Sequence, residues 1–205
     1  MRKKSRFITL EGIDGAGKST HIKEISQWIT NQGIEVVCTR EPGGTPFGEK
    51  LREMVLHEKM DIMSETLLMF AARNEHIKTV IEPALNQGKW VLSDRFTDAS
   101  FAYQGGGRGV ARETLRTLAA WVEVRSPDLT LLFDIDPALA QQRVAQSTPQ
   151  PDRFEQEQRL FFDRVRDAYL ERAQQNPDRI VIIDSAANLS NLKSTVINIL
   201  NERLV

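Results

Sequence analysis

The sequence has little of several features that would point to particular classes of protein. Its 205 residues include one cysteine, Cys38, so no disulfide can form within the chain, as is usual in a reducing compartment. No apolar run approaches the ~18 residues that span a bilayer, and the run behind the basic start of the chain ends at Glu11, too short for a signal peptide. A net charge of −1 gives no general attraction to nucleic acid or to an anionic membrane. These absences predict a cytoplasmic protein without nucleic-acid or membrane partners, whose important cations act locally on phosphates.

Short apolar runs alternate with helical segments along the chain. We predict five strands, at residues 7–10, 34–39, 90–93, 129–133 and 180–183. This alternation favours right-handed crossovers and a parallel sheet with helices on both faces, which makes the fold class α/β. The length suits one domain over residues 1–205. Ligands of such sheets bind beyond the carboxyl ends of the strands, so the residues just after each strand are the functional candidates.

The first strand runs into a glycine-rich turn with a phosphate-binding pattern. Gly12, Gly17, Lys18 and Ser19 have the spacing G-x-x-x-x-G-K-[ST] of the P-loop. Its backbone N–H groups cradle phosphates, Lys18 reaches the β- and γ-phosphates, and Ser19 can hold Mg²⁺. The predicted nucleotide-binding residues are Gly12, Ile13, Asp14, Gly15, Ala16, Gly17, Lys18, Ser19 and Thr20. The pattern alone does not distinguish a kinase from a GTPase or an ATPase.

Two further strand ends carry a cation beside a carboxylate. Arg40 and Glu41 follow the second strand, and Asp94 and Arg95 follow the third. An acid such as Asp94 can order a Mg²⁺ shell opposite Ser19, and Arg95 can bridge two phosphates as charge builds between them. The alternative for each pair is a solvated ion pair at a surface turn.

The middle of the chain carries candidates for reading a base. Ser100 and Gln104 are four residues apart, so on a helix they share one face, and a glutamine amide can both donate to and accept from a base edge. The glycine run that follows, which begins with residues 105–107, is predicted to be flexible. Phe70 precedes Arg73 by three residues in a long helical region, 64–87, where an aromatic side chain is more often core. The alternative for Ser100 and Gln104 is a polar helix face before a linker.

A turn-rich break at residues 147–151 lies between Arg143 and Arg153. Residues 143–155 are predicted to form a mobile flap, because phosphoryl transfer uses such segments to exclude water and to bring arginines to the moving group. A plain surface loop with two solvated arginines is the alternative.

Six segments together make the chain resemble bacterial thymidylate kinases, the dTMP kinases among the P-loop nucleoside-monophosphate kinases. They run in family order from about residue 6 to 170: EGIDGAGKST, TREPGGT, LLMFAARNEHI, SDRFTDASFAYQGGGRG, PDLTLLFDIDP and DRFEQE. The resemblance implies a three-layer P-loop fold, transfer of the γ-phosphoryl group of ATP to dTMP with Mg²⁺, and a homodimer.

The resemblance also implies three groups of site residues. The first surrounds the phosphates and the metal, and comprises Asp14, Lys18, Ser19, Arg40, Glu41, Asp94 and Arg95. The second reads the thymine edge, and comprises Arg73, Ser100 and Gln104. The third encloses the nucleotide, with Arg52 above it, Tyr103 against the 2′ position of the sugar, and Phe70 or Met69 over the base.

The chain departs from the family in its P-loop. Some relatives carry an arginine after the P-loop acid, where this chain has Gly15. We therefore expect cationic help from the flap, with Arg153 acting on the moving phosphoryl group just before a helix that begins near Glu155. Arg143, on the preceding helix, is expected to pack against the donor base or to pair with a fixed phosphate.

Two other functions compete with this interpretation. One is a P-loop kinase of a different nucleoside monophosphate or small acceptor, which a panel of acceptors would reveal. The other is a GTP-binding switch, which should carry the guanine-recognition motif [NT]-K-x-D, and the sequence has none.

Overall fold

The computed structural model describes residues 4–122, 125–147 and 152–204 and contains one five-stranded parallel sheet. The strand order is β2-β3-β1-β4-β5. The strands are β1 (Phe7–Glu11), β2 (Val36–Arg40), β3 (Trp90–Asp94), β4 (Leu129–Asp134) and β5 (Ile180–Asp184). The predicted α/β fold with a five-stranded parallel sheet is therefore confirmed, and each predicted strand end lies within two residues of the observed one.

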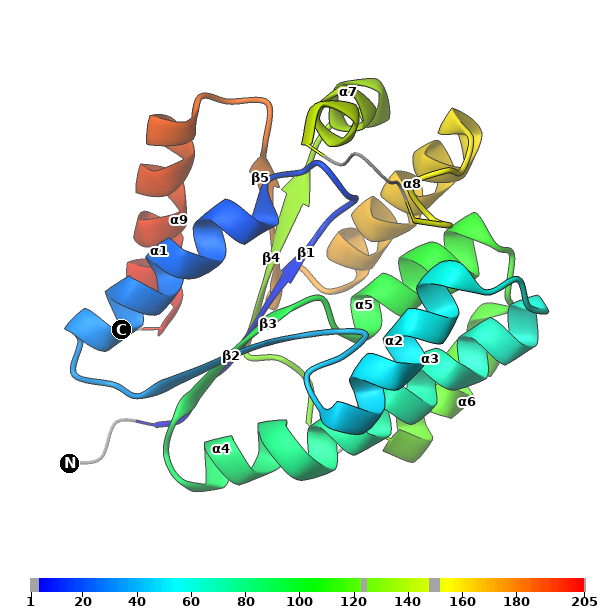
Figure 1. Cartoon of the computed structure of the whole chain (residues 1–205). Helices are drawn as coiled ribbons and strands as arrows, with labels where there is room; N and C mark the ends of the chain where they lie inside the picture. The colour runs from blue at the N-terminus through cyan, green and yellow to red at the C-terminus, as the bar shows by residue number, and fades with distance from the viewer. Residues whose placement is uncertain (1–3, 123–124, 148–151, 205) are drawn as a thin grey trace.

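Helices cover both faces of this sheet (Figure 1). On one side lie α1 (Lys18–Asn31) and α9 (Leu189–Leu204), which pack against each other. The other side carries α2 (Pro46–His57), α3 (Ile62–His76), α4 (Glu82–Asn86), α5 (Thr97–Ser100), α6 (Arg112–Val122) and α8 (Arg159–Gln175). Two π-helical segments, η1 (Ile77–Ile81) and η2 (Phe101–Gly107), continue α3 and α5, and α7 (Pro137–Ser147) follows β4.

The central strands are buried on both faces. Leu10, Leu92 and Leu131, from three neighbouring strands, have no exposed surface. Such strands read as nearly continuous apolar runs, because a parallel sheet is covered by helices on both sides. Two buried polar residues at its centre, Thr9 and Thr130, hydrogen-bond each other at 2.7 Å between their hydroxyl oxygens. The centre of the sheet is thus a buried platform, and the loops that follow the strands begin at its carboxyl edge.

The glycines at 105–107 belong to a close helix contact. They end η2, which packs against α8. A Cβ atom at Gly106 would lie 2.6 Å from the Cβ of Ala168, and one at Gly107 would lie 2.4 Å from the ring of Phe161. The expectation of a flexible segment here was therefore wrong, because the absent side chains let two helices approach.

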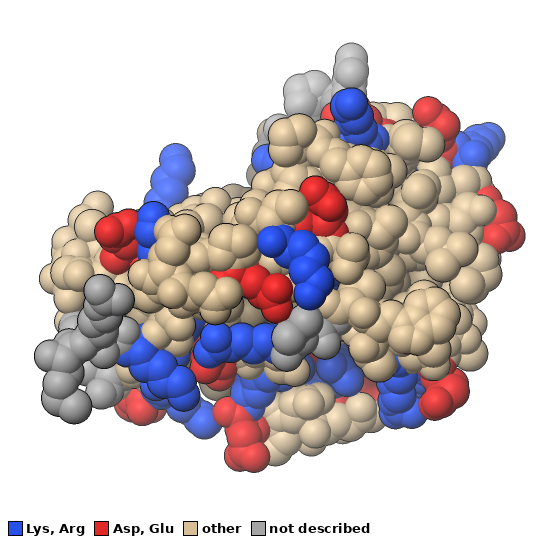
Figure 2. Space-filling view, turned by 90° about the horizontal axis from the view of Figure 1, so that it is seen from below, with Lys and Arg blue, Asp and Glu red and all other residues tan. Residues whose placement is uncertain are grey.

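The surface carries charges of both signs. Figure 2 shows the face at the bottom of Figure 1, where basic and acidic side chains are interspersed with uncharged surface. Within the ranges that the structure describes, no helix has the length and the hydropathy to cross a membrane.

Candidate functional site

The P-loop forms a closed curl between β1 and α1. The Lys18 ammonium group turns back over the loop and donates to the carbonyl oxygens of Gly12 at 2.9 Å and Ile13 at 3.0 Å. Lys18 is buried, so its charge is held at a fixed place at the helix N-terminus. A helix N-terminus and an ammonium group together form a site for an anion.

Gly15 is the point at which helix α7 touches this loop. Its φ is +83°, which side chains other than glycine rarely adopt, and a Cβ atom here would lie 2.3 Å from the carbonyl oxygen of Ala140. An arginine at this position would therefore strain the loop and clash with α7 as they stand here. One turn further along α7, Arg143 donates to the carbonyl oxygens of Gly15 at 3.5 Å and Ser185 at 3.2 Å. A cation from α7 thus reaches this side of the loop.

A cavity of about 630 Å³ opens in front of the P-loop. Most of the residues predicted around the phosphates line it: Asp14, Gly15, Gly17, Lys18, Ser19, Arg40, Glu41, Arg52, Asp94, Arg95 and Arg143. Five of them are cationic, which suits a ligand with several phosphate groups. Val144, Gln146 and Glu155 also line this cavity, and the sequence analysis named none of them as a site residue.

Asp14 and Arg95 form the centre of the wall between this cavity and the next. The Arg95 guanidinium donates to Asp14 at 2.6 Å, to the Tyr103 hydroxyl at 3.0 Å and to the Tyr169 hydroxyl at 3.1 Å. Burial by itself raises the pKa of Asp14, but Arg95 and Lys18 lower it to about 2. Asp14 is therefore a fixed anion at neutral pH that orients Arg95.

Beneath them lies Glu11, the last residue of β1. Its carboxylate accepts hydrogen bonds from the Phe96 backbone N–H at 2.7 Å and from the Tyr169 hydroxyl at 2.8 Å. Burial, together with the negative charge of Asp98, raises the pKa of Glu11 to about 8. At neutral pH, Asp14 is therefore charged, whereas Glu11 favours its neutral, protonated form.

The outer edge of the phosphate cavity is more open. Arg40 is paired with Glu49 of α2 at 2.8 Å, and Arg52 donates to the carbonyl oxygen of Pro42 at 3.0 Å. Glu49 also accepts from the Gly44 backbone N–H at 2.9 Å, which fixes the turn after β2. The sequence analysis missed Glu49. It could have been found from its position, because an acid in the first turn of a helix, after an N-cap such as Thr45, lies beside the loop that precedes the helix.

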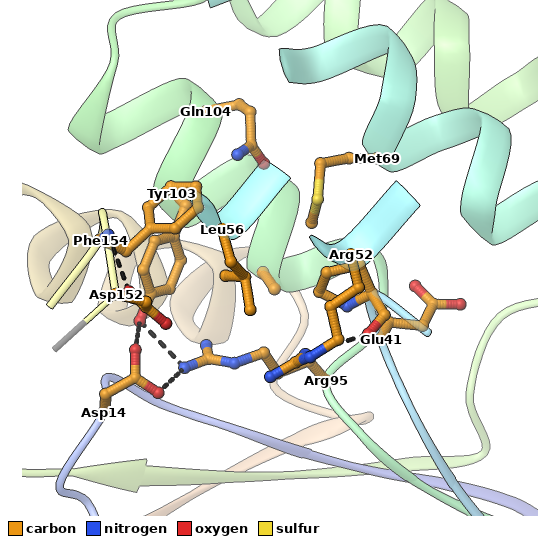
Figure 3. A pocket seen from close by; sticks show the side chains of 12 residues that line it. Asp14, Glu41, Arg52, Leu56, Met69, Arg95, Tyr103, Gln104, Asp152 and Phe154 are labelled. Carbon is orange, nitrogen blue, oxygen red and sulfur yellow. Dashed lines mark hydrogen bonds and ion pairs between the residues drawn. The ribbon is translucent and has the colours of Figure 1, made fainter. Parts of the chain in front are cut away.

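A second, smaller cavity of about 80 Å³ adjoins the first and shares Asp14, Glu41, Arg52 and Arg95 with it. Figure 3 shows its other labelled walls, which are Leu56, Met69, Tyr103, Gln104, Asp152 and Phe154. The amide of Gln104 points toward the space between Leu56, Met69 and Tyr103. This cavity combines apolar walls, such as Leu56, Met69 and Phe154, with polar and charged side chains, which suits a flat ring with polar edges.

Arg73 is fixed beside this cavity by a buried ion pair. Its Nε donates to Glu41 at 2.7 Å and its Nη2 donates to the Phe96 carbonyl oxygen at 3.2 Å. The other oxygen of Glu41 lies 2.8 Å from His76 Nδ1. All three side chains are almost fully buried, so Glu41 holds Arg73 in one position rather than forming a solvated surface pair.

Each of the three residues predicted to read a base has a buried polar atom without a hydrogen-bond partner in the described part of the chain. These atoms are Arg73 Nη1, Ser100 Oγ and Gln104 Oε1. Gln104 lines the cavity, Ser100 lies one turn before it, and Arg73 lies one turn after Met69, which also lines the cavity. Buried polar atoms that lack a partner are costly, so three of them together point to a polar ligand.

Two predicted site residues lie elsewhere. Phe70 packs in a core cluster with Phe101, Leu115 and Leu118 and lines neither cavity, whereas Met69 does line the smaller one. Met69 therefore replaces Phe70 as the candidate side chain over a base. The sequence left the choice between these two neighbours open, because it does not fix the rotation of the helix and the two positions differ by about 100° around its axis.

Arg153 is the other displaced residue, because its guanidinium lies on α2 and α3 and away from the P-loop. It donates to the Val55 carbonyl oxygen at 2.8 Å and to Glu65 at 2.7 Å, and it lines neither cavity. Residues 148–151 of the predicted flap lie outside the described residues, and the next helix begins at Arg159 rather than near Glu155. Action of Arg153 on the phosphoryl group stays a prediction.

Two of the cavity residues suit a divalent cation bound together with phosphates. Asp94 Oδ1 is buried and has no hydrogen-bond partner among the residues of known placement, and the Ser19 hydroxyl lines the same cavity. No group of three or more His, Cys, Asp or Glu side chains occurs within residues 4–122, 125–147 and 152–204 in an arrangement that could hold a metal ion. A site with one carboxylate and one hydroxyl matches Mg²⁺, which keeps several waters and takes phosphate oxygens as ligands.

The chain is similar to known proteins over nearly its full length. The family model described as thymidylate kinase matches residues 10–196. A thymidylate kinase of Methylobacillus flagellatus is 56% identical over 200 residues, covering 97% of this chain and 98% of the relative. One of Paraburkholderia xenovorans is 55% identical over 195 residues, covering 93% of this chain and 94% of the relative. A crystal structure of thymidylate kinase from Ehrlichia chaffeensis superposes with a TM-score of 0.80 at 33% identity, covering 96% of this chain and 98% of that one.

Proposed function

The chain belongs to the thymidylate kinase family, and from this premise we propose that it transfers the γ-phosphoryl group of ATP to dTMP, giving dTDP and ADP. The observation that carries the proposal is the match to thymidylate kinases over nearly the full length of the chain. The two adjoining cavities support it, since one has cations for phosphates and the other has apolar walls for a base.

The donor binds at the P-loop. Lys18 and the N-terminus of α1 face the phosphates of ATP. Arg143 on α7 lies at the side of the P-loop, where it donates to the carbonyl oxygens of Gly15 and Ser185. Ser19 and Asp94 would hold Mg²⁺, which neutralises the developing charge on the phosphates when it is bound. Arg143 is expected to contact the donor, because its contacts place it beside the loop.

The acceptor binds with its base in the smaller cavity. Thymine presents two carbonyl acceptors and one N3–H donor, so Arg73 Nη1 is expected to donate to a carbonyl and Gln104 Oε1 to accept from N3–H. Ser100 Oγ can serve either way. Leu56 and Met69 cover the faces of the ring, and Tyr103 lies toward the sugar, where it would crowd a 2′-hydroxyl group.

Phosphoryl transfer takes place between the cavities, where Arg95 lies. Such reactions depend on positioning and on stabilising charge rather than on covalent chemistry by the protein. Arg95 is held by Asp14, Tyr103 and Tyr169, so its charge is oriented before the substrates arrive. Arg40 and Arg52 are expected to hold the phosphate of dTMP from the outer edge.

We also propose that the protein is a cytoplasmic homodimer. The single cysteine supports the compartment. The dimer is supported by exposed apolar side chains on three helices of one side of the molecule, namely Phe47, Met54, Ile62, Met63, Leu67 and Trp121 on α2, α3 and α6. Sedimentation of a 23.3 kDa species alone at micromolar concentration would contradict the dimer.

One assay tests the activity. The protein is mixed with ATP, Mg²⁺ and one nucleoside monophosphate at a time, and ADP and the nucleoside diphosphate are measured by chromatography. We expect dTMP to have the highest kcat/KM in a panel with dUMP, dCMP, dGMP and dAMP. Preference for another monophosphate would support the alternative, a P-loop kinase with a different acceptor.

A further inference from the structure

Glu65 is a buried carboxylate in the first turn of α3 that joins three segments far apart in the sequence. Its Oε1 accepts a hydrogen bond from Gln104 Nε2 at 2.8 Å, and its Oε2 accepts one from Arg153 Nη2 at 2.7 Å. Arg108 Nε lies 3.5 Å from the same Oε2. The Glu65 side chain is 1% exposed, so its charge is enclosed by these partners.

This contact decides how the Gln104 amide is oriented. A carboxylate accepts hydrogen bonds and has nothing to donate, so the NH₂ end of the amide must face Glu65. The oxygen is then turned away from Glu65, and it is buried without a partner among the described residues, whereas the amide nitrogen already donates to Glu65. Gln104 lines the smaller cavity, so its unpartnered oxygen is the hydrogen-bond acceptor that a ligand there would meet.

We propose that Glu65 is a positioning residue that locks Gln104 as an acceptor and thereby selects pyrimidines that carry an N3–H group. Thymine and uracil have this hydrogen, whereas N3 of cytosine is itself an acceptor and would face the Gln104 oxygen without a hydrogen between them. The proposal rests on the function proposed above, because it assumes that the base of the acceptor lies in the smaller cavity.

A second interpretation of Glu65 gives it only a structural role, as an anchor for Arg153 and Arg108. The two differ in a measurable way. An anchor supports the whole cavity, so its loss weakens every nucleotide alike. A lock on the amide acts on one hydrogen bond, so its loss changes the preference between bases.

The test compares the wild-type protein with Glu65→Gln, in which the new amide can donate to the Gln104 oxygen and lets that side chain turn. Dissociation constants of dTMP, dUMP and dCMP are measured by titration calorimetry. We expect the preference for dTMP over dCMP to fall at least ~10-fold, since a buried hydrogen-bonding group left unpaired changes affinity about 10- to 100-fold. The preference for dTMP over dUMP should not change, because both carry N3–H.

Glu157→Gln is the matched control. Glu157 also pairs with Arg108, whereas the hydrogen bond of the Gln104 amide nitrogen goes to Glu65. Its replacement removes a carboxylate from the same arginine, so the preference for dTMP over dCMP should stay within about threefold of the wild type. A change as large as that of Glu65→Gln would show that the arginine cluster, rather than the amide lock, sets the preference, and would overturn the proposal.

Three further results decide the matter. A folded Glu65→Gln protein that keeps its preference within about threefold of the wild type overturns the proposal. If that variant does not fold, a crystal structure of the wild-type protein with dTMP replaces it, and a Gln104 amide beyond hydrogen-bonding distance of Glu65 overturns the proposal. Failure of the wild-type protein to phosphorylate dTMP would instead remove the proposed function, so the two failures are distinguishable.

Discussion

Glu41→Gln should destabilise the protein strongly while changing its shape little. Glu41 accepts one hydrogen bond from Arg73 at 2.7 Å and contacts His76 at 2.8 Å, and all three side chains are at most 3% exposed. The substitution removes the negative charge and leaves the Arg73 guanidinium buried without its counterion. Breaking one side of a buried ion pair costs about 3–5 kcal/mol, so we expect the free energy of unfolding to fall by that amount.

Urea denaturation at neutral pH measures this loss, provided that the m-value is unchanged. The control is Glu113→Gln, because Glu113 pairs with Arg116 at 3.5 Å with its side chain 83% exposed, and such pairs contribute less than about 1 kcal/mol. The double variant Glu41→Gln/Arg73→Met should be more stable than Glu41→Gln alone, since no buried charge is left unpaired. A loss below about 1 kcal/mol in Glu41→Gln would refute the importance of this buried pair. The variant should also weaken binding of dTMP more than binding of ATP, because Arg73 lies beside the smaller cavity.

Three further predictions concern the P-loop and the platform beneath it. Lys18→Ala should lower kcat at least about 10³-fold while the circular dichroism spectrum stays that of a folded protein, and near-normal turnover would contradict the donor site. Arg143→Ala should raise the KM for ATP and leave the KM for dTMP unchanged in steady-state kinetics, whereas equal effects on both would contradict its place at the donor side. Burial and Asp98 raise the pKa of Glu11 from 4.5 to about 8, so the folded protein holds this proton more tightly than the unfolded chain does. The free energy of unfolding should therefore fall as pH rises from about 4.5 to 8, by at most ~1.4 kcal/mol per pH unit, and Glu11→Gln should remove this part of the pH dependence in urea titrations.

The sequence predicts those parts of the site whose residues lie close together along the chain. The P-loop spacing locates Lys18 and Ser19, and the rule that ligands bind beyond the carboxyl ends of parallel strands locates Asp94 and Arg95. Both rules depend on local backbone geometry, which a short segment determines.

Partners that are distant in the sequence were not predictable in the same way. Glu65 meets Gln104 and Arg153 across 39 and 88 positions, and nothing in the sequence around α3 distinguishes this glutamate from a solvated one. The choice between Met69 and Phe70 depended on the rotation of one helix, which its packing against α6 decides. Arg153 was assigned to the phosphates because an arginine in a flap suits that task, but its hydrogen bonds form with α2 and α3.

The glycine contact between η2 and α8 limits how the preference of this protein for its acceptor could evolve. Every replacement of Gly106 or Gly107 adds a Cβ atom where α8 already stands, so the backbone that carries Ser100 and Gln104 has no room to shift. A relative that comes to phosphorylate another nucleotide is therefore expected to change the side chains at Ser100, at Gln104 or at Glu65, which holds Gln104, while the backbone stays in place. A new specificity should therefore arise from a few side-chain substitutions on an unchanged backbone, and not from gradual movement of the helix.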